Sequence, residues 1–417
     1  MGRTIHIIGA GLAGLSAAVR LAQTPATVVV HEATRQAGGR CRSYADAATG
    51  LTIDNGNHLL LSGNHAARDY LSTIGSEAHL VGPAGADFPF VDLATNERWT
   101  VRINDGRIPW WIFDSGRRVP GTSPRDYLAL APLLWAAADK TVCETVPCSG
   151  PLYERLSHPL LLAALNIDPR EGSAMLAGAI VRETLAAGGK ACRPLVARAG
   201  LGPAFIEPAL EYLRASNVVV RFEHELRGIA MGDGRAASLD FGIDKVALDT
   251  DDAVIVAIPA YAAKPLIPGL DPSSTFRAIV NAHFRVTPPV DCPPLLGVVN
   301  GTVEWLFAFP DRLSVTISAA DRLMDTPREA LARTIWSEVS RIAGLPDELP
   351  PWQVVRERRA TFAATPAENA KRPPAQTSWR NLFLAGDWTA TGLPATIEGA
   401  IRSGHRAAQC VMQSKAS

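Results

Sequence analysis

The 417-residue sequence lacks an excess of charge of either sign, and it lacks an apolar run long enough to cross a membrane. Its 41 basic residues balance 41 acidic ones, so no overall field attracts nucleic acid or anionic lipid. The best apolar stretch, residues 253–270, is interrupted by Pro259, Lys264 and Pro265, which argues against a spanning helix. We therefore expect no nucleic-acid partner, and any membrane contact should be peripheral and chiefly apolar.

Cysteines are also few, and none has the spacing of a metal or dithiol site. The six are scattered without a CxxC or Cys/His pattern, which predicts no metal ligands and free thiols throughout. These are Cys41, Cys143, Cys148, Cys192, Cys292 and Cys410. We also expect no secretory leader, because the first predicted strand follows Met1 almost at once. The expected location is the cytoplasm, with peripheral contact at the inner face of the cytoplasmic membrane.

Glycine, in contrast, is placed with a clear pattern near the start of the chain. A buried strand at Ile5–Ile8 leads into the GxGxxG pattern of Gly9, Gly11 and Gly14, and a helix of small apolar residues follows. In this pattern the glycines permit a tight turn, close approach of a pyrophosphate and close packing of helix on strand. The sequence therefore predicts a dinucleotide on the helix N-terminus.

A glutamate at the end of the next strand indicates which nucleotide binds. The predicted strand Thr27–His31 ends at Glu32, 18 residues beyond Gly14. A carboxylate at this position can accept hydrogen bonds from both ribose hydroxyls. An adenosine ribose without a 2′-phosphate fits best.

Two further segments favour FAD over NAD. In QAGGRCRS, Gly38 and Gly39 allow close backbone approach, and Arg40 can reach the phosphates or the flavin edge; an ordinary glycine-rich loop with a solvated arginine is the alternative. Near the C-terminus a short strand, residues 381–385, precedes Gly386 and Asp387. That carboxylate suits a ribityl hydroxyl or a water at the pyrophosphate.

The segment GLPATIEGAIRSG then opens a C-terminal helix. Its free N–H groups at Ala395, Thr396 and Ile397 would point at the flavin N1 and C2 carbonyl, where negative charge collects on reduction. The alternative is a helix that only closes the core.

The candidate proton donor lies in a polar turn that is flanked by apolar residues, within LTIDNGNHLLLSG. Asp54, Asn55, Gly56, Asn57 and His58 follow a short strand. Such a turn can run along the isoalloxazine ring, with His58 placed to donate a proton; a hydrogen-bonded structural histidine is the competing interpretation.

The order of segments predicts a cofactor domain that a second domain interrupts twice. Its pieces would be 1–83, 193–270 and 372–417, leaving 84–192 and 271–371 for a substrate domain. Strands near 218–222 and 236–241 suggest a small antiparallel sheet by the adenine, with Leu226 as a backbone contact. A helix over DYLALAPLLWAAA and a mixed sheet including WLFAF and LSVTIS are expected in the substrate domain. Its large apolar residues at 110–113 and 127–135 indicate a pocket, a lipid-docking surface or ordinary core.

Taken together, GAGLAG with Glu32, GGRCRS, DNGNHLLLSG, VIVAIP and LAGDWTATGLPATIEGAIRSG resemble the amine oxidase and phytoene desaturase superfamily. Within it the chain is most similar to the squalene-associated flavoproteins of bacterial hopanoid biosynthesis. The resemblance implies an α/β fold: a Rossmann-like FAD-binding domain (GR2 type) interrupted by a mixed α+β substrate-binding domain.

The same resemblance implies an activity and a set of contacts. The activity is reductive removal of the allylic hydroxyl of hydroxysqualene to give squalene, with hydride from reduced FAD. His58, or a water that it orients, would be the acid, and Asp54 would tune His58 or only fix the turn. The predicted FAD contacts are Gly9, Gly11, Leu12, Ala13, Gly14, Glu32, Gly38, Gly39, Arg40, Asn57, His58, Leu226, Gly386, Asp387, Ala395, Thr396 and Ile397.

Some departures from the superfamily pattern narrow the choice. Asn57 stands where the superfamily often has glutamine, and we find no counterpart of the flavin-facing lysine or of the aromatic pair of amine oxidases near Asp387, where Trp388 is followed by threonine. Amine oxidation is therefore less attractive. A carotenoid-type desaturase, an amine oxidase and an isoprenoid lipid carrier of the same fold stay open. Without a second GxGxxG unit, the electron donor would be free NADPH or a partner reductase.

Overall fold

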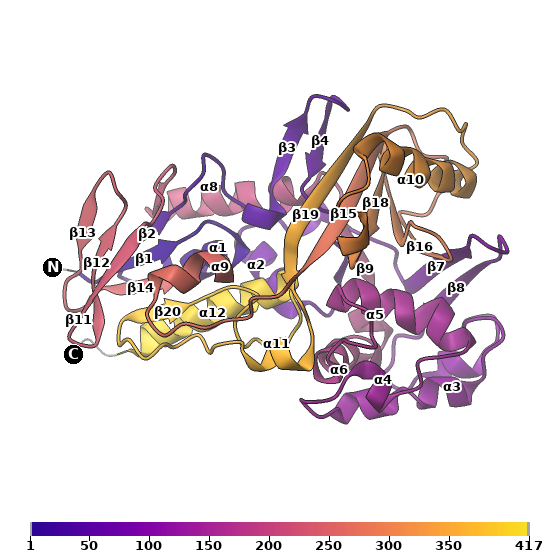
Figure 1. Cartoon of the computed structure of the whole chain (residues 1–417), viewed down its shortest axis with the longest axis horizontal. Helices are drawn as coiled ribbons and strands as arrows, with labels where there is room; N and C mark the ends of the chain where they lie inside the picture. Colours follow the sequence, from indigo (N-terminus) through magenta and orange to yellow (C-terminus); the bar gives the residue numbers. More distant parts are fainter. Residues whose placement is uncertain (1, 415–417) are drawn as a thin grey trace.

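The computed structural model describes residues 2–414 and builds on two large sheets that lie at opposite ends of the molecule (Figure 1). One end holds a five-stranded parallel sheet, and both chain termini lie there. The other end holds a seven-stranded mixed sheet with a group of short helices beside it. The α/β fold with a Rossmann-like part and a mixed α+β part is therefore confirmed.

The parallel sheet has the strand order β10-β2-β1-β14-β20, and every neighbouring pair is parallel. Three predicted strands, at residues 5–8, 27–31 and 381–385, are confirmed to within two residues at each end. The five strands are β1 (Thr4–Ile8), β2 (Thr27–His31), β10 (Val219–Arg221), β14 (Ala253–Val256) and β20 (Leu382–Leu384).

Both faces of this sheet are covered, which explains why its strands read as unbroken apolar runs. Ala253 and Ile255 of β14 face one apolar cluster, and Val254 and Val256 face another. The first cluster is closed by α1 (Leu12–Leu21), α8 (Glu207–Ala215) and α12 (Ile397–Gln413). The second is closed by the antiparallel sheet of β11 (Gly228–Gly232), β12 (Arg235–Asp240) and β13 (Lys245–Ala247), together with α9 (Ala260–Ala263).

The mixed sheet has the order β19-β15-β18-β17-β16-β7-β8, and only the β16–β7 pair is parallel. Helix α10 (Arg328–Ala343) packs on one face, because alternate residues of β15 and β18 supply an apolar surface there. The strands are β7 (Ala86–Asp92), β8 (Arg98–Ile103), β15 (Phe276–Arg285), β16 (Leu295–Val299), β17 (Trp305–Phe309), β18 (Arg312–Ile317) and β19 (Trp352–Phe362). The predicted mixed sheet, with WLFAF and LSVTIS as strands, is confirmed.

Short helices and ribbons complete the molecule. The helices are α2 (His65–Thr73), α3 (Pro124–Leu128), α4 (Val142–Thr145), α5 (His158–Leu165), α6 (Ala174–Glu183), α7 (Gly189–Cys192) and α11 (Pro366–Ala370). The 3₁₀ segments used below are η3 (Trp110–Phe113) and η4 (Ala131–Trp135). The small ribbons are β3 (Ser43–Asp46) with β4 (Leu51–Asp54), and β9 (Pro194–Ala197) between β5 (Leu60–Leu61) and β6 (Leu80–Val81).

Two secondary-structure predictions are wrong. The strand near 218–222 is β10, and it extends the parallel sheet beside β2 instead of pairing with residues 236–241. The helix expected over DYLALAPLLWAAA is split into α3 and η4, because Pro132 cannot donate the backbone hydrogen bond that a continuous helix needs.

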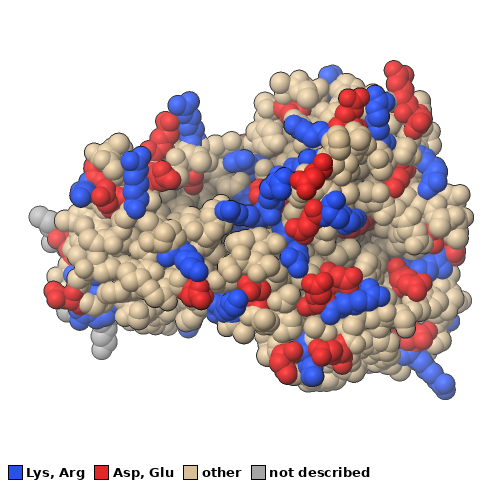
Figure 2. Space-filling view, in the orientation of Figure 1, with Lys and Arg blue, Asp and Glu red and all other residues tan. Residues whose placement is uncertain are grey.

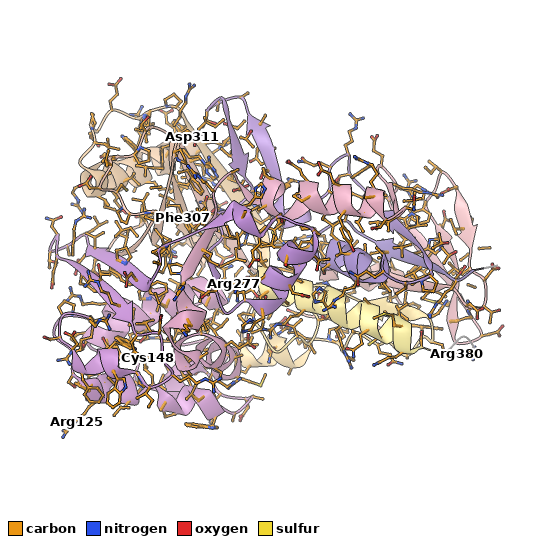
Figure 3. All side chains as sticks on the ribbon, turned by 180° about the vertical axis from the view of Figure 1, so that it is seen from behind. Arg125, Cys148, Arg277, Phe307, Asp311 and Arg380 are labelled. Carbon is orange, nitrogen blue, oxygen red and sulfur yellow. A yellow bond between two sulfur atoms is a disulfide. The ribbon has the colours of Figure 1, made fainter. Side chains whose placement is uncertain are left out.

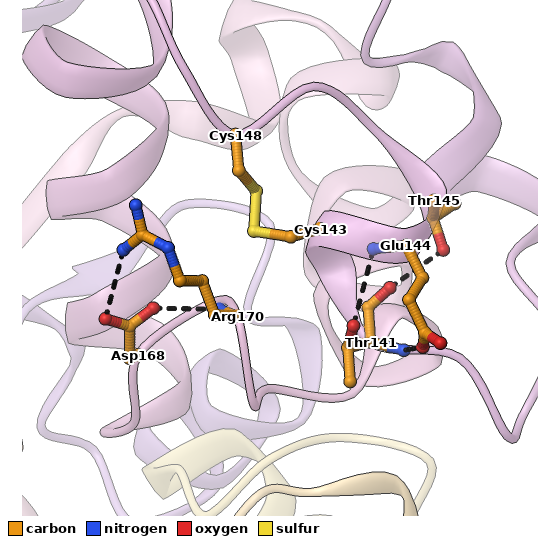
Figure 4. The surroundings of a disulfide bond; sticks show 7 residues. All are labelled: Thr141, Cys143, Glu144, Thr145, Cys148, Asp168 and Arg170. Carbon is orange, nitrogen blue, oxygen red and sulfur yellow. Dashed lines mark hydrogen bonds and ion pairs between the residues drawn. A yellow bond between two sulfur atoms is a disulfide. The ribbon is translucent and has the colours of Figure 1, made fainter.

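The prediction that all six cysteines are free thiols is also wrong. Cys143, on α4, forms a disulfide with Cys148, and their Cα atoms are 5.3 Å apart (Figure 4). The capping box of Thr141 and Glu144 fixes the start of α4 and so holds Cys143 next to the returning chain. Cys41, Cys192, Cys292 and Cys410 are free.

The face of the molecule shown in Figure 2 carries both signs of charge side by side, with broad uncharged areas between them. Within residues 2–414, no helix combines the length and the apolarity that crossing a bilayer requires.

Candidate cofactor and active site

The glycine turn between β1 and α1 has the space that the dinucleotide pattern requires. Gly9 has φ +104°, and a Cβ there would lie 2.8 Å from the carbonyl oxygen of Ala257. A Cβ on Gly14 would lie 1.9 Å from the carbonyl oxygen of Gly9. A Cβ on Gly11 would meet no described atom within 4 Å. Gly9 and Gly14 are thus needed for the turn and for packing, whereas Gly11 faces open space where a pyrophosphate can approach.

The start of α1 is suited to an anion. Gly11 is its N-cap residue and provides no side chain to bind the first N–H groups, and the first turn contains no acidic residue. Leu12 and Ala13, the first helical residues, are buried. Because uncapped N–H groups and the helix dipole favour negative charge, this end of α1 can hold a phosphate.

The loop with Gly38 and Gly39 lies against this turn. The Gly38 amide donates to the Ala10 carbonyl at 2.8 Å, and Gly38 forms a parallel bridge with Gly11. Both Gly38 and Gly39 have positive φ, a conformation that glycine adopts without strain. Two glycine-rich segments therefore border one open space.

Glu32 stands at the end of β2, beside the same turn. Its Oε2 accepts from the Ala10 amide at 2.8 Å, and its Oε1 accepts from the amide and the hydroxyl of Thr34. These contacts orient the carboxylate and still leave it partly exposed. Each carboxylate oxygen accepts more than one hydrogen bond, so ribose hydroxyls can also bind.

Arg40 and Asp387 join the two ends of the chain. Arg40 Nη2 donates to Asp387 Oδ1 at 2.7 Å, and Arg40 Nη1 donates to the carbonyl of Ala360. The Asp387 carboxylate raises the pKa of Arg40 above its ordinary value. The sequence predicted both residues as cofactor contacts but did not predict that they bind each other.

Arg372 is a residue of this region that sequence reasoning missed. It is buried, and its guanidinium donates to the carbonyls of Asp387 and Leu393 and to Thr391 Oγ1. It therefore holds the loop GDWTATGLP in place. No motif marks Arg372 in the sequence, because the residues it binds are brought to it by the fold.

The start of α12 follows directly from that loop. Thr396 is the N-cap residue, and its Oγ1 accepts from the Gly399 amide at 3.0 Å. The Gly386 amide donates to Ser403 Oγ at 2.7 Å, which ties the end of β20 to α12. Ala395 packs against the apolar cluster that contains Leu133 and Phe362. The helix N-terminus is thus fixed where the two halves of the molecule meet.

These residues fit FAD. Open space over Gly11, an uncapped helix start, an oriented Glu32 and the Arg40–Asp387 pair are what an adenosine diphosphate and its ribityl extension require. Leu226 lies elsewhere in the same half, buried with Ile8 and Phe241 beneath the parallel sheet.

Among residues 2–414, no hydrogen bond or ion pair joins Asp54 to His58. Its carboxylate accepts from the hydroxyl of Ser43 and from the Leu201 amide, the latter at 2.8 Å. Burial raises the pKa of Asp54, and these two hydrogen bonds oppose the rise. Of the two roles considered for Asp54, the contacts are those of a residue that fixes the turn, because β4 ends there against residues 200–202.

His58 lies at the boundary between polar and apolar surroundings. Burial, with a smaller effect of Arg40, lowers the pKa of His58 to about 4, so the ring is neutral at neutral pH. The next residue, Leu59, packs on an apolar cluster of Phe88, Phe90, Trp99, Trp305, Phe307 and Phe309 among others. His58 is therefore half-buried and directly precedes, along the chain, a residue of this apolar cluster.

Asn57 is held by the mixed sheet. Its Nδ2 donates to the carbonyl of Val315 and to Thr316 Oγ1, each at 3.2 Å, and its amide donates to Asn281 Oδ1 at 3.3 Å. Its Oδ1 is buried and has no partner among the described residues. Asn281 and Thr316 were not identified from the sequence, since no motif marks them and the fold alone brings them to Asn57.

Comparisons with known proteins agree with this geometry. The model of the family "Flavin containing amine oxidoreductase" matches residues 12–412. The chain is 62% identical over 413 residues to "Hydroxysqualene dehydroxylase" of Rhodopseudomonas palustris, covering 99% of both chains. It is 60% identical over 412 residues to the protein of that name from Sinorhizobium fredii, again covering 99% of each. The solved structure of cyclohexylamine oxidase from Brevibacterium oxydans superposes with a TM-score of 0.71 at 18% identity, covering 99% of each chain.

Proposed function

The chain belongs to the flavin-containing amine oxidoreductase family and, within it, to the hydroxysqualene dehydroxylases, and we infer that it reductively removes the allylic hydroxyl of hydroxysqualene to give squalene, in hopanoid biosynthesis. It is an FAD-dependent oxidoreductase. The observation that supports hydroxysqualene as the substrate is the 62% identity, over 99% of both chains, with the Rhodopseudomonas palustris protein.

The reaction is an exchange at one carbon atom. A proton converts the allylic hydroxyl into a water leaving group, and the C–O bond breaks to leave a delocalised cation on the substrate. When bound in its reduced form, FAD supplies the hydride that forms the new C–H bond. One proton and one hydride are consumed, and one water is released.

His58 is the residue that we assign to the proton. Since its pKa is about 4, few molecules carry the imidazolium at neutral pH, so the neutral ring acts by hydrogen bonding a water that gives its proton to the hydroxyl. The hydroxide that this water becomes takes up a proton from the solvent, which is the one proton consumed. Positioned proton donors of this kind contribute about 10²- to 10⁴-fold to rates. Asp54, bound to Ser43 and Leu201, holds the turn on which His58 sits.

Exclusion of water is the second requirement, because a cation in contact with bulk water is recaptured. The cluster beside Leu59 is built from large apolar side chains of the mixed sheet. We propose that this side of the molecule binds the C30 chain, whose burial contributes about 25 cal/mol per Å² of apolar surface.

The chain segments can be assigned to two domains on this basis. We propose that 1–83, 193–270 and 372–417 form the FAD-binding domain and that 84–192 and 271–371 form the substrate-binding domain. In support, all five strands of the parallel sheet come from the first three segments, and all seven strands of the mixed sheet lie within the other two.

The FAD contacts named from the sequence stay part of this proposal. So do two partners: free NADPH or a reductase that returns electrons to the flavin, and a membrane that the protein contacts peripherally while it takes up the isoprenoid.

The test is turnover by the purified holoenzyme. Hydroxysqualene in detergent micelles is incubated anaerobically with the protein and a chemical reductant, and extracted lipids are analysed by mass spectrometry. Squalene formed in excess over enzyme supports the proposal. Unchanged hydroxysqualene would reject it, as would oxygen-dependent peroxide formation from amines as the only activity.

A further inference from the structure

Large apolar side chains are exposed together at one end of the molecule. Five of them lie between residues 108 and 135, and the remaining exposed large apolar residues are scattered over other elements. The five are Ile108, Trp110, Phe113, Leu128 and Trp135, which are 60%, 64%, 62%, 58% and 79% exposed. We call them the aromatic patch. A cluster of this kind on a protein surface indicates an interaction site.

The patch is one surface, because its elements pack on one another. On η3, Trp110 lies 6.2 Å from Phe113 between ring centroids. Beneath them Trp111 contacts Tyr127 of α3 edge to face at 4.9 Å. Leu128 and Trp135 then line the same groove of about 690 Å³, with Pro132 and Lys140 among its other walls.

The exposed side chains are held from below. Trp111, Ile112 and Leu133 are buried next to the exposed residues. A Cβ on Gly178 of α6 would lie 1.9 Å from the carbonyl oxygen of Leu133, so η4 rests directly on α6. On the far side of the groove, Glu144 and Thr145 line the wall beside the Cys143–Cys148 disulfide (Figure 4). The patch is therefore presented by an ordered surface.

Charge is positive on the side of the patch formed by η3 and α3, whereas on the groove side Lys140 pairs with Glu144 at 3.9 Å and Asp139 is exposed. Residues 102–128 contain five arginines and three aspartates. Each aspartate is engaged locally: Asp105 with Arg193, Asp114 with the Gly116 amide and Asp126 with the Ser123 amide. Within residues 2–414, exposed Arg107 and Arg125 form no ion pair. Figure 3 places Arg125 at the outer corner of the molecule.

From these observations we propose that the aromatic patch docks on the surface of an anionic lipid bilayer, with the apolar side chains in the interface and Arg107 and Arg125 on lipid phosphates. Tryptophan and phenylalanine at a lipid interface, with arginine beside them, are the side chains that this environment favours. The proposal rests on the proposed function, because docking would give the enzyme access to a C30 isoprenoid that resides in the bilayer.

The distribution of charge separates a bilayer from a second copy of this chain. A copy bound by a two-fold axis would place the arginine rim of one molecule against the arginine rim of the other. An anionic leaflet instead supplies phosphate groups to that rim while accepting the aromatic side chains, and both features are satisfied at once.

The experiment measures binding of the FAD-loaded protein to vesicles by flotation. Vesicles of phosphatidylcholine with one quarter phosphatidylglycerol are compared with pure phosphatidylcholine. The test variant is Trp110→Ser/Phe113→Ser/Trp135→Ser. The matched control, Ile243→Ser/Val290→Ser/Met412→Ser, removes three exposed apolar side chains elsewhere. A second variant, Arg107→Gln/Arg125→Gln, is matched by Arg35→Gln/Arg333→Gln.

We expect the patch variant to bind at least tenfold more weakly than the control, and the Arg107/Arg125 variant to lose the preference for anionic vesicles. Equal binding of patch variant and control would overturn the proposal. The proposal would also be overturned if light scattering in lipid-free solution showed a smaller oligomer for the patch variant than for the wild type, because the patch would then be an interface between copies of the chain. Retained FAD and an unchanged melting temperature verify that variants fold; should the triple variant fail this, Trp135→Ser alone and quenching by brominated lipid replace it.

Turnover in detergent micelles tests the proposed activity independently of bilayer docking, because micelles deliver the substrate without a bilayer. Patch-variant turnover at the wild-type rate with weakened vesicle binding supports the docking surface and leaves the activity intact. Wild-type vesicle binding without turnover would reject the activity alone. Turnover without vesicle binding by the wild type would reject the docking surface alone.

Discussion

Arg40 donates a hydrogen bond to Asp387 at 2.7 Å, although the two residues are 347 positions apart in the sequence. The pair joins the glycine loop that follows β2 to the strand end that precedes α12. Both halves of the proposed FAD site are thereby fixed to each other as well as to the parallel sheet. Disturbing either residue should loosen the site without unfolding the sheet.

Replacing Arg40 by Met is expected to weaken FAD binding at least tenfold, equivalent to about 1.4 kcal/mol, because the buried Asp387 carboxylate loses its partner. Titration of apoprotein with FAD, followed by flavin fluorescence, measures this. The control is Arg35→Met, whose exposed ion pair with Glu223 lies on the surface and should contribute little. If both variants bind FAD as tightly as the wild type, the pair has no role in the site.

Substitutions at two glycines of one motif should affect different properties, protein stability at Gly14 and FAD binding at Gly11. Gly14→Ala is expected to lower the free energy of unfolding by roughly 1–3 kcal/mol through overpacking, since its Cβ would lie 1.9 Å from the Gly9 carbonyl oxygen. Gly11→Ala should leave the apoprotein as stable as the wild type, because nothing described lies within 4 Å of its Cβ, yet weaken FAD binding at least tenfold. Denaturant unfolding of the apoproteins and FAD titration separate the two; the reverse outcome would refute the assignment of the open space to the pyrophosphate.

His58→Gln is expected to cut turnover about 10²-fold while FAD content stays unchanged. In the wild type, turnover should be nearly independent of pH between 5 and 8, because the pKa of His58 is about 4 and the working form is neutral. If the imidazolium were the acid, turnover would rise about tenfold for each pH unit of acidification across that range. His65→Gln, at an exposed histidine, should behave as wild type.

Acid stability should depend on a stack of three histidines behind the parallel sheet. His6 contacts His31, His31 contacts His224 at 2.8 Å, and His224 contacts Asp244. Burial, and after it the neighbouring histidines, lower the pKa of His31 to about 2. Between pH 6.5 and about 2 the unfolded chain therefore binds a proton that the folded chain excludes.

In that window the free energy of unfolding should fall as the pH falls, by about 1.4 kcal/mol per unit for this one group; above pH 6.5 this group causes no pH dependence. His31→Gln should reduce the slope by that amount, measured by urea unfolding between pH 6.5 and 4.5. His79→Gln, at an exposed position, should keep the full slope. An unchanged slope in His31→Gln would contradict the pKa shift.

Sequence patterns predicted the parts of the fold that depend on local order. β1, β2 and β20 are short apolar runs whose ends are marked by glycine or a charge, and α12 begins within GLPATIEGAIRSG as expected. The strand near 218–222 was found but was given the wrong neighbour, because which strand pairs with which is decided by distant residues. The helix over 126–138 was misjudged because its apolar spacing outweighed Pro132.

The residues of the candidate site also fall into those that local sequence patterns identified and those that they did not. Residues in motifs, such as Gly9, Glu32 and Asp387, were identified as candidates. Arg372, Asn281 and Thr316 were not, since each acts through partners from other segments that only the folded chain brings near. The Cys143–Cys148 disulfide was missed because a spacing of five residues matches no common motif, and only the turn after α4 brings the two sulfurs together.

The central claim, that reduced flavin on this protein delivers hydride to hydroxysqualene, is tested most directly by an anaerobic single turnover. The holoenzyme is photoreduced, substrate is added in the absence of any other reductant, flavin reoxidation is followed by absorbance, and squalene is quantified by mass spectrometry. The account predicts one squalene for each flavin reoxidised. Flavin that stays reduced, with hydroxysqualene recovered intact, would contradict it.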